Sequence, residues 1–139
     1  IKRLGAGLTL LGDGDIAAAL WAARPEGDHD MLLGIGAAPE GVITATAIRG
    51  TGGVFEGRLV FRSDEEQARA AGMIDDDLTR LWGAKDLCQS EDAIFVASGV
   101  CDGYLPGVKV YNDGTVATFA EMIDVATGRV TRHDRTHSL

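Results

Sequence analysis

Cysteine, basic residues and long apolar runs are all scarce in this sequence, and each scarcity excludes a class of protein. The two cysteines, Cys88 and Cys101, are too few for a disulfide scaffold or a four-cysteine zinc site. No apolar run approaches the roughly 20 residues of a transmembrane helix, and residues 1–5 lack the apolar region of a secretory signal. We therefore expect a cytoplasmic protein with reduced thiols and no membrane partner.

Positive charge is outweighed by negative charge. The chain has 13 Lys and Arg residues against 21 Asp and Glu residues, a net charge of −8. Such a chain repels nucleic acid at long range, so we expect no nucleic-acid partner, and a phosphorylated ligand would need a metal ion or locally gathered basic residues. With 45% hydrophobic and 24% charged residues, the 139 residues fit one globular domain spanning 1–139. Because the first residue is Ile1, we expect this chain to be part of a longer protein.

The first two thirds of the chain alternate between apolar runs and helical patterns. Short apolar runs bounded by glycine-rich turns predict strands, and the alanine-rich or amphipathic stretches between them predict helices. Ser63 followed by Glu66 predicts a capping box at one helix start. The expected strands are residues 4–11, 30–36, 54–61 and 93–97, and the expected helices are residues 16–23, 41–49, 63–71 and 75–87.

The last third changes to β-prone runs separated by turn signals. Residues 108–111, 115–125 and 129–131 are the runs, and Asn112-Asp113-Gly114 and Thr127-Gly128 are typical of hairpin turns. Strands that alternate with helices predict right-handed crossovers and parallel pairing. The predicted fold is an α/β sandwich with a mixed, largely parallel central sheet, helices on both faces, and antiparallel hairpin strands at the C-terminal end.

Carboxylates follow three of the predicted strands: Asp13 with Asp15, Glu40, and Asp102. In an open α/β sheet the ligand crevice lies beyond the carboxyl ends of the strands, so these loops are candidates for one site. Paired carboxylates accept hydrogen bonds from sugar hydroxyls or bind a hard cation. Two structural alternatives stay open: Asp15 as a helix cap, and Glu40 as an ordinary acidic residue in a first helical turn.

Other familiar signatures fail. The stretch from Gly34 through Gly36 to Pro39 lacks the third glycine of the dinucleotide fingerprint, so a nucleotide cofactor is not expected. The Asp13-Gly14-Asp15 turn does not continue into a calcium-binding loop. His133 and His137 could join the two cysteines in a zinc site by count, but the spacing misses the usual ligand pattern.

Four blocks carry a family resemblance in their order and spacing. They are LGDGDIAAA at residues 11–19, DMLLGIGAAPEGV at 30–42, GGxxxGRL at 52–59 and ASGVxDGxLxGV at 97–108. Together they resemble the C-terminal half of class II fructose-1,6-bisphosphatases. The resemblance implies a phosphoric monoester hydrolase of gluconeogenesis that releases the 1-phosphate of fructose 1,6-bisphosphate and leaves fructose 6-phosphate.

The resemblance also implies roles for particular residues. Asp13, Gly14 and Asp15 would contact the sugar-phosphate substrate, position 37 would lie against it, and Glu40 would be a catalytic ligand of Mg²⁺ or Mn²⁺. Position 37 is Ala37, where the family usually has glycine. Family members are considerably longer, and their N-terminal lobe, in the same or another chain, would supply the other acidic ligands and the basic residues that hold phosphate.

Two alternatives stand beside this interpretation. One is a stand-alone sugar-phosphate-binding or regulatory module without catalysis, and the other is a phosphatase for a related sugar or inositol phosphate. Homo-oligomers are compatible with each. The isolated 139 residues are expected to be inactive and to bind metal weakly, because a single carboxylate leaves most of a divalent ion's coordination sphere to water. We further expect Asp13, Asp15 and Glu40 to open onto one pocket.

Overall fold

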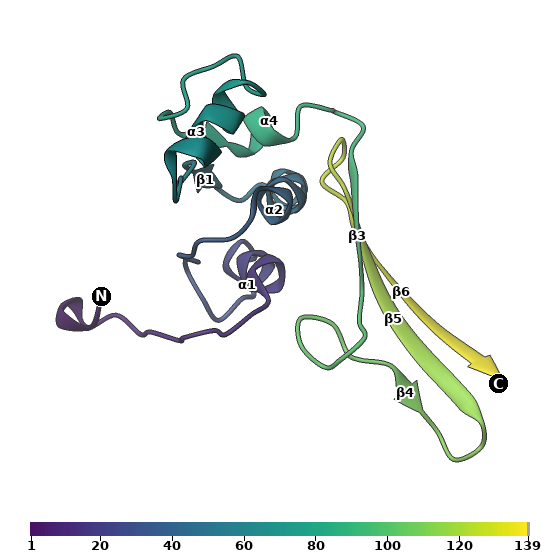
Figure 1. The fold of residues 1–139 in the computed structure, drawn as a ribbon. Helices are drawn as coiled ribbons and strands as arrows, with labels where there is room; N and C mark the ends of the chain where they lie inside the picture. The colour runs from purple at the N-terminus through teal and green to yellow at the C-terminus, as the bar shows by residue number, and fades with distance from the viewer. Residues whose placement is uncertain (139) are drawn as a thin grey trace.

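The computed structural model describes residues 1–138, which form a helical part and a β part (Figure 1). The helical part holds a small two-stranded sheet, and the β part is a four-stranded sheet. The helices are α1 (Asp15–Ala22), α2 (Ala38–Thr51), α3 (Asp64–Ala71) and α4 (Ala84–Leu87), with a 3-10 turn η1 (Lys2–Leu4) before them. The strands are β1 (Glu56–Gly57), β2 (Trp82–Gly83), β3 (Ile94–Ser98), β4 (Lys109–Val110), β5 (Thr115–Asp124) and β6 (Val130–Ser138).

Strand β5 is the centre of the four-stranded sheet. It pairs antiparallel with β6 along nearly its whole length, so β3 and β4 share its other edge. The turn from β4 to β5 uses Gly114 at φ 82°, while Asp113 accepts hydrogen bonds from the Thr115 backbone and hydroxyl. The turn from β5 to β6 uses Gly128 at φ 67°. The predicted hairpins at the C-terminal end are confirmed, and β6 is longer than expected.

Helices α1 and α2 pack against this sheet through a small core. Leu20 of α1, Ala47 of α2, Phe95 of β3 and Ile123 of β5 form its buried cluster. A Cβ at Gly50 would collide with the side chain of Ile123, so this glycine lets α2 approach β5 closely. The core therefore fixes both helices, and with them the loops at their N-terminal ends.

The expectation of a largely parallel sheet is wrong, because both sheets are antiparallel. The expected helices on both faces are also not found among residues 1–138: Figure 1 shows α1 to α4 on one side of the four-stranded sheet. Residues 4–11 and 30–36, both expected as strands, are the end of a 3-10 turn and unpaired chain with exposed apolar side chains. An apolar run indicates burial, but a strand also needs a partner, and none pairs with either run among the described residues.

Local side-chain hydrogen bonds decide two further regions. The expected helix over 75–87 is wrong apart from α4, since Asp77 bonds the backbone N–H and hydroxyl of Thr79 and holds a turn instead. The expected helix at 63–71 is confirmed as α3, and Ser63 Oγ accepts the Glu66 N–H at 3.3 Å. The Glu66 carboxylate reaches the Arg62 N–H instead of the Ser63 N–H. The expected strand over 54–61 is reduced to the two residues of β1.

One property of the helices bears on the membrane question. No helix within residues 1–138 combines the length and the apolar character needed to span a bilayer.

Candidate functional site

The turns that lead into α1 and α2 meet at one pocket of about 220 Å³. Asp13, Gly14 and Asp15 line it from the first turn, and Ala37 and Glu40 line it from the second. The remaining lining residues are Ile16 and Gly36. The structure thus brings together the five residues that the sequence singles out, although the turns do not follow paired strands.

The first turn is shaped by Gly14, which has φ 89° and occupies the N-cap position of α1. Its N–H donates to Oδ1 of Asp13 at 2.7 Å, which holds that side chain beside its own turn. Asp15 is the first helical residue, and no side-chain hydrogen bond caps α1. The interpretation of Asp15 as a helix cap is therefore wrong.

The carboxylate of Asp15 reaches the second turn. A Cβ placed on Gly36 would lie 3.1 Å from Oδ2 of Asp15, so the glycine leaves room for this carboxylate between the two turns. Among residues 1–138, no hydrogen bond or salt bridge of the protein engages the side chains of Asp15 and Glu40. Both carboxylates are exposed and free to meet a ligand.

The second turn is held by the start of α2. Ala37 is the N-cap residue at φ −79° and ψ 159°, a conformation that any amino acid adopts, so an alanine at this position brings no backbone strain. Pro39 and Glu40 lie in the first turn, where proline is tolerated and a negative charge is stabilised by the helix dipole. Buried Thr44, Ala45 and Ile48 anchor the helix behind them.

The donor chemistry of the pocket suits a hard divalent cation, because carboxylate oxygens are the preferred ligands of Mg²⁺ and Mn²⁺. The number of donors does not complete a site. Within residues 1–138, no three Asp, Glu, His or Cys side chains come close enough together to hold a metal ion. The carboxylates of this pocket therefore do not make a complete metal site by themselves.

The third predicted loop carboxylate, Asp102, does not line this pocket. It accepts the Gly107 N–H at 2.9 Å and contacts the Lys109 ammonium at 3.0 Å. These two partners, the backbone N–H first, lower the pKa of Asp102 below its ordinary value. Its role is to close the loop between β3 and β4.

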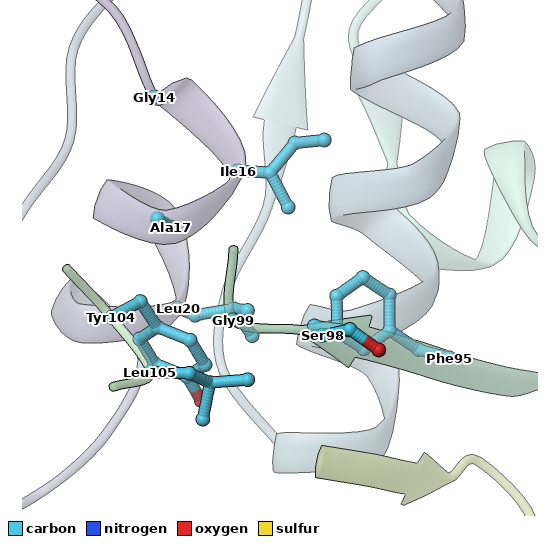
Figure 2. A pocket seen from close by; sticks show the side chains of 10 residues that line it. Gly14, Ile16, Ala17, Leu20, Phe95, Ser98, Gly99, Tyr104 and Leu105 are labelled. Carbon is cyan, nitrogen blue, oxygen red and sulfur yellow. The ribbon is translucent and has the colours of Figure 1, made fainter. Parts of the chain in front are cut away.

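A second pocket of about 290 Å³ adjoins the first and shares Gly14 and Ile16 with it. Figure 2 shows the Tyr104 and Leu105 side chains on one side of this pocket and Phe95 on the other, with α1 along it. Its lining residues are Gly14, Ile16, Ala17, Leu20, Phe95, Ala97, Ser98, Gly99, Tyr104 and Leu105. The loop between β3 and β4 thus closes against the helix that carries Asp15.

A buried acid behind this second pocket was not singled out from the sequence. Glu121 of β5 is fully buried and accepts hydrogen bonds from Arg24 and from the Tyr104 hydroxyl, each at 2.6 Å. Burial and the contact with Glu121 raise the pKa of Tyr104 well above its ordinary range. The sequence does contain a signal for this burial. Side chains alternate between the two faces of a strand, so Glu121 lies on the same face of β5 as the buried Ile123.

Comparison with known proteins agrees with the sequence blocks. A family model described as "Bacterial fructose-1,6-bisphosphatase, glpX-encoded" matches residues 1–137. The chain is 34% identical over 154 residues to the D-fructose 1,6-bisphosphatase class 2/sedoheptulose 1,7-bisphosphatase of Gloeobacter violaceus, covering 100% of the chain and 44% of that relative. The D-fructose 1,6-bisphosphatase class 2/sedoheptulose 1,7-bisphosphatase 1 of Acaryochloris marina is 35% identical over 151 residues, covering 100% of the chain and 44% of that relative.

A third relative of that name, from Thermosynechococcus vestitus, is 38% identical over 130 residues, which are 82% of the chain and 37% of the relative. The chain therefore spans less than half the length of the curated relatives it matches. The family match covers nearly every residue from the first turn of the pocket to the last strand of the sheet. By this match the chain belongs to the glpX-encoded, class II fructose-1,6-bisphosphatase family.

Proposed function

We propose that this chain is the substrate-binding lobe of a metal-dependent phosphatase that converts fructose 1,6-bisphosphate into fructose 6-phosphate and phosphate. The reaction would be a cytoplasmic step of gluconeogenesis. The observation that carries the proposal is the gathering of Asp13, Asp15 and Glu40 around one pocket in a chain of this family. A pocket with this donor set suits a hydroxyl-rich ligand accompanied by a cation.

Charge decides how the substrate would lie. Three carboxylates repel a phosphate group at close range, so Asp13 and Asp15 would accept hydrogen bonds from sugar hydroxyls and leave the phosphate to other groups. Gly14 lacks a side chain, and its positive φ turns the backbone sharply between the two acids. Ala37 would lie beside the sugar with only a methyl group to accommodate.

Glu40 would be this lobe's ligand for Mg²⁺ or Mn²⁺. Such an ion, when bound, neutralises phosphate oxygens and lowers the pKa of a bound water. The remaining ligands would come from the part of the family's length that this chain does not span, in the same or another chain. The isolated chain is accordingly expected to bind sugar phosphate weakly and to turn over none.

A second substrate is favoured by the names of the relatives, which include sedoheptulose 1,7-bisphosphatase. A hydrogen bond between a carboxylate and a sugar hydroxyl does not depend on the number of carbons in the sugar. The open pocket also sets no sharp limit on sugar length. We propose that the hydroxyl groups of sedoheptulose 1,7-bisphosphate bind to Asp13 and Asp15 in the same way.

The test is ligand binding by nuclear magnetic resonance with Mn²⁺ as a paramagnetic probe. Fructose 1,6-bisphosphate should shift the amide signals of residues 13–16 and 36–40, and Mn²⁺ should broaden the signals nearest Glu40. Asp15→Asn should weaken sugar binding about tenfold, the effect of losing a hydrogen bond to a charged group. Glu40→Gln should remove the Mn²⁺ effect and leave the sugar shifts.

Glu26→Gln is the matched control, because Glu26 is exposed and does not line the pocket. Phosphate release by this chain alone, or ligand shifts confined to other residues, would show that the site has been misplaced. Sugar binding that is the same with and without Mn²⁺ would favour a binding module without catalysis.

A further inference from the structure

Two apolar segments that lead into the site have no partner within the described residues. We call residues 6–11 and 31–36 the leading segments. Neither makes a backbone–backbone hydrogen bond within residues 1–138. In the second segment the alternating side chains of Met31, Leu33 and Ile35 are 70%, 72% and 77% exposed. In the first segment Leu10 is 85% exposed. Such surface resembles the edge of a sheet that lacks its next strand.

Both leading segments end at the site. The His29 ring nitrogen Nε2 lies 3.2 Å from the Thr9 hydroxyl, so the first segment contacts the chain two residues before the second segment. The first segment runs into Asp13, and the second runs into Ala37. Figure 1 shows the chain before α1 extending away from the four-stranded sheet, and the link between α1 and α2 also lies on that side of the helices.

The occupant is indicated by what this chain does not span. The curated relatives are more than twice as long, since the chain covers 44% of two of them. The site also stops short of a complete metal-binding group among residues 1–138. A partner strand laid along either leading segment would end at the rim of this pocket and bring its own side chains there.

The outer face of the four-stranded sheet is a less well supported candidate for the docking surface. The outer face of the four-stranded sheet exposes Ile94, Val96 and Val110, but the backbone of these strands is already paired. The leading segments offer both apolar side chains and unpaired N–H and C=O groups, which is the combination that strand addition uses.

We propose that the leading segments are the docking surface for the remainder of the family's length, which adds β-strands to them and completes the pocket. This inference rests on the proposed function, because the added lobe is the one that would supply the missing ligands. The lobe is either part of the same polypeptide or a separate chain, and the surface is the same in both cases.

The experiment mixes this chain with the portion of the Gloeobacter violaceus relative that lies outside its matched region. Amide hydrogen exchange is followed in the chain alone and in the mixture. Exchange at residues 6–11 and 31–36 should slow at least about tenfold on mixing, because opening a paired strand then becomes necessary. Lack of association, or protection elsewhere only, overturns the proposal.

Paired variants locate the contact. The double variant Met31→Asp/Leu33→Asp should weaken association about a hundredfold, as expected when two buried apolar side chains are replaced by charges. The matched control Val54→Asp/Met73→Asp changes residues that are 89% and 79% exposed outside the leading segments, and it should bind normally. If Val96→Asp abolishes association while the first double variant binds normally, the outer sheet face is the docking surface and the proposal is wrong.

Two more outcomes keep the inference separate from the proposed function. Protection that rises with the concentration of this chain alone would identify a second copy as the occupant and overturn the proposal. In the same samples, fructose 1,6-bisphosphate shifts at residues 13–16 report the proposed function independently. Protection of the leading segments without any sugar binding supports the docking surface and contradicts the function, and the reverse result contradicts only the docking surface.

Discussion

Glu121 is the residue on which the loop between β3 and β4 depends. Its carboxylate has no exposed surface and is held by Arg24, whose side chain is 10% exposed, and by the Tyr104 hydroxyl. Arg24 also stacks over the Tyr104 ring at 5.1 Å. Arg24 lies just after α1 and Tyr104 lies in the loop, so this one acid joins the helix that carries Asp15 to the sheet.

Removing one partner from this buried group should be costly. Arg24→Ala leaves Glu121 as a buried charge without its closest cation, and we expect a loss of about 3 kcal/mol in the free energy of unfolding. Arg132→Ala is the control, since Arg132 is 65% exposed and lies 3.4 Å from the same carboxylate, and it should cost less than about 1 kcal/mol. Urea denaturation measures both, and equal losses would contradict the assignment of Arg24 as the main partner.

Tyr104 should make the chain sensitive to alkaline pH. Burial first, and then the hydrogen bond to Glu121, raise the pKa of Tyr104 above its ordinary value of 10.0 in the folded state. The folded protein therefore keeps a proton that the unfolded chain loses. The stabilisation is complete below about pH 10 and is lost as pH rises from there through the folded pKa.

Urea denaturation repeated at increasing pH tests this expectation. Above about pH 10 the stability of the wild-type chain should fall more steeply than that of Tyr104→Phe, which has no hydroxyl to titrate. Parallel curves for the two proteins would show that Tyr104 does not titrate differently in the folded and unfolded states.

At the scale of elements, the turns and helix ends that depend on neighbouring residues alone could be predicted. Gly114 and Gly128 allow the left-handed turns of the two hairpins, and Ser63 caps α3, so these features follow from neighbouring residues alone. The starts of α1 and α2, and with them Asp13, Asp15 and Glu40, were found in the same way. Their meeting at one pocket agrees with the spatial expectation, and their chemical roles stay predictions.

Features that depend on distant residues could not be predicted. The apolar runs at 4–11 and 30–36 have strand-like composition, but pairing depends on a partner that no local pattern reveals. The bond between Arg24 and Glu121 spans 97 residues, so no spacing rule points to it. The parallel sheet was an inference from strand–helix alternation, and it failed because the strands of the four-stranded sheet all lie in the last third of the chain.

Helix α3 gives an element-scale test of local capping. It has no buried residue, so the tertiary core contributes little to it and its first turn matters more. Ser63→Ala removes the acceptor for the Glu66 N–H and should destabilise α3 by about 1 kcal/mol. Ser63→Gly should destabilise α3 by only about a few tenths of a kcal/mol. Faster amide exchange in residues 64–71 of the alanine variant, with exchange in α2 unchanged, is the expected result.

For the whole molecule, the net charge disfavours self-association and the leading segments favour it. A charge of −8 keeps copies of the chain apart at neutral pH, while exposed Met31, Leu33 and Ile35 favour association. The repulsion disappears near the isoelectric point of about 4.7. We therefore expect the chain alone to self-associate as pH is lowered toward that value, and light scattering at graded pH would detect it.

The variants of the docking experiment separate the two causes. Met31→Asp/Leu33→Asp should stay monomeric closer to the isoelectric point than Val54→Asp/Met73→Asp, although both double variants add the same charge. The difference arises because both residues of the first pair lie on one continuous unpaired segment, whereas the Met73 N–H already donates to the Ala70 carbonyl. Equal behaviour of the two variants would mean that charge alone governs association, and that the leading segments are no more adhesive than any other exposed apolar residues of the molecule.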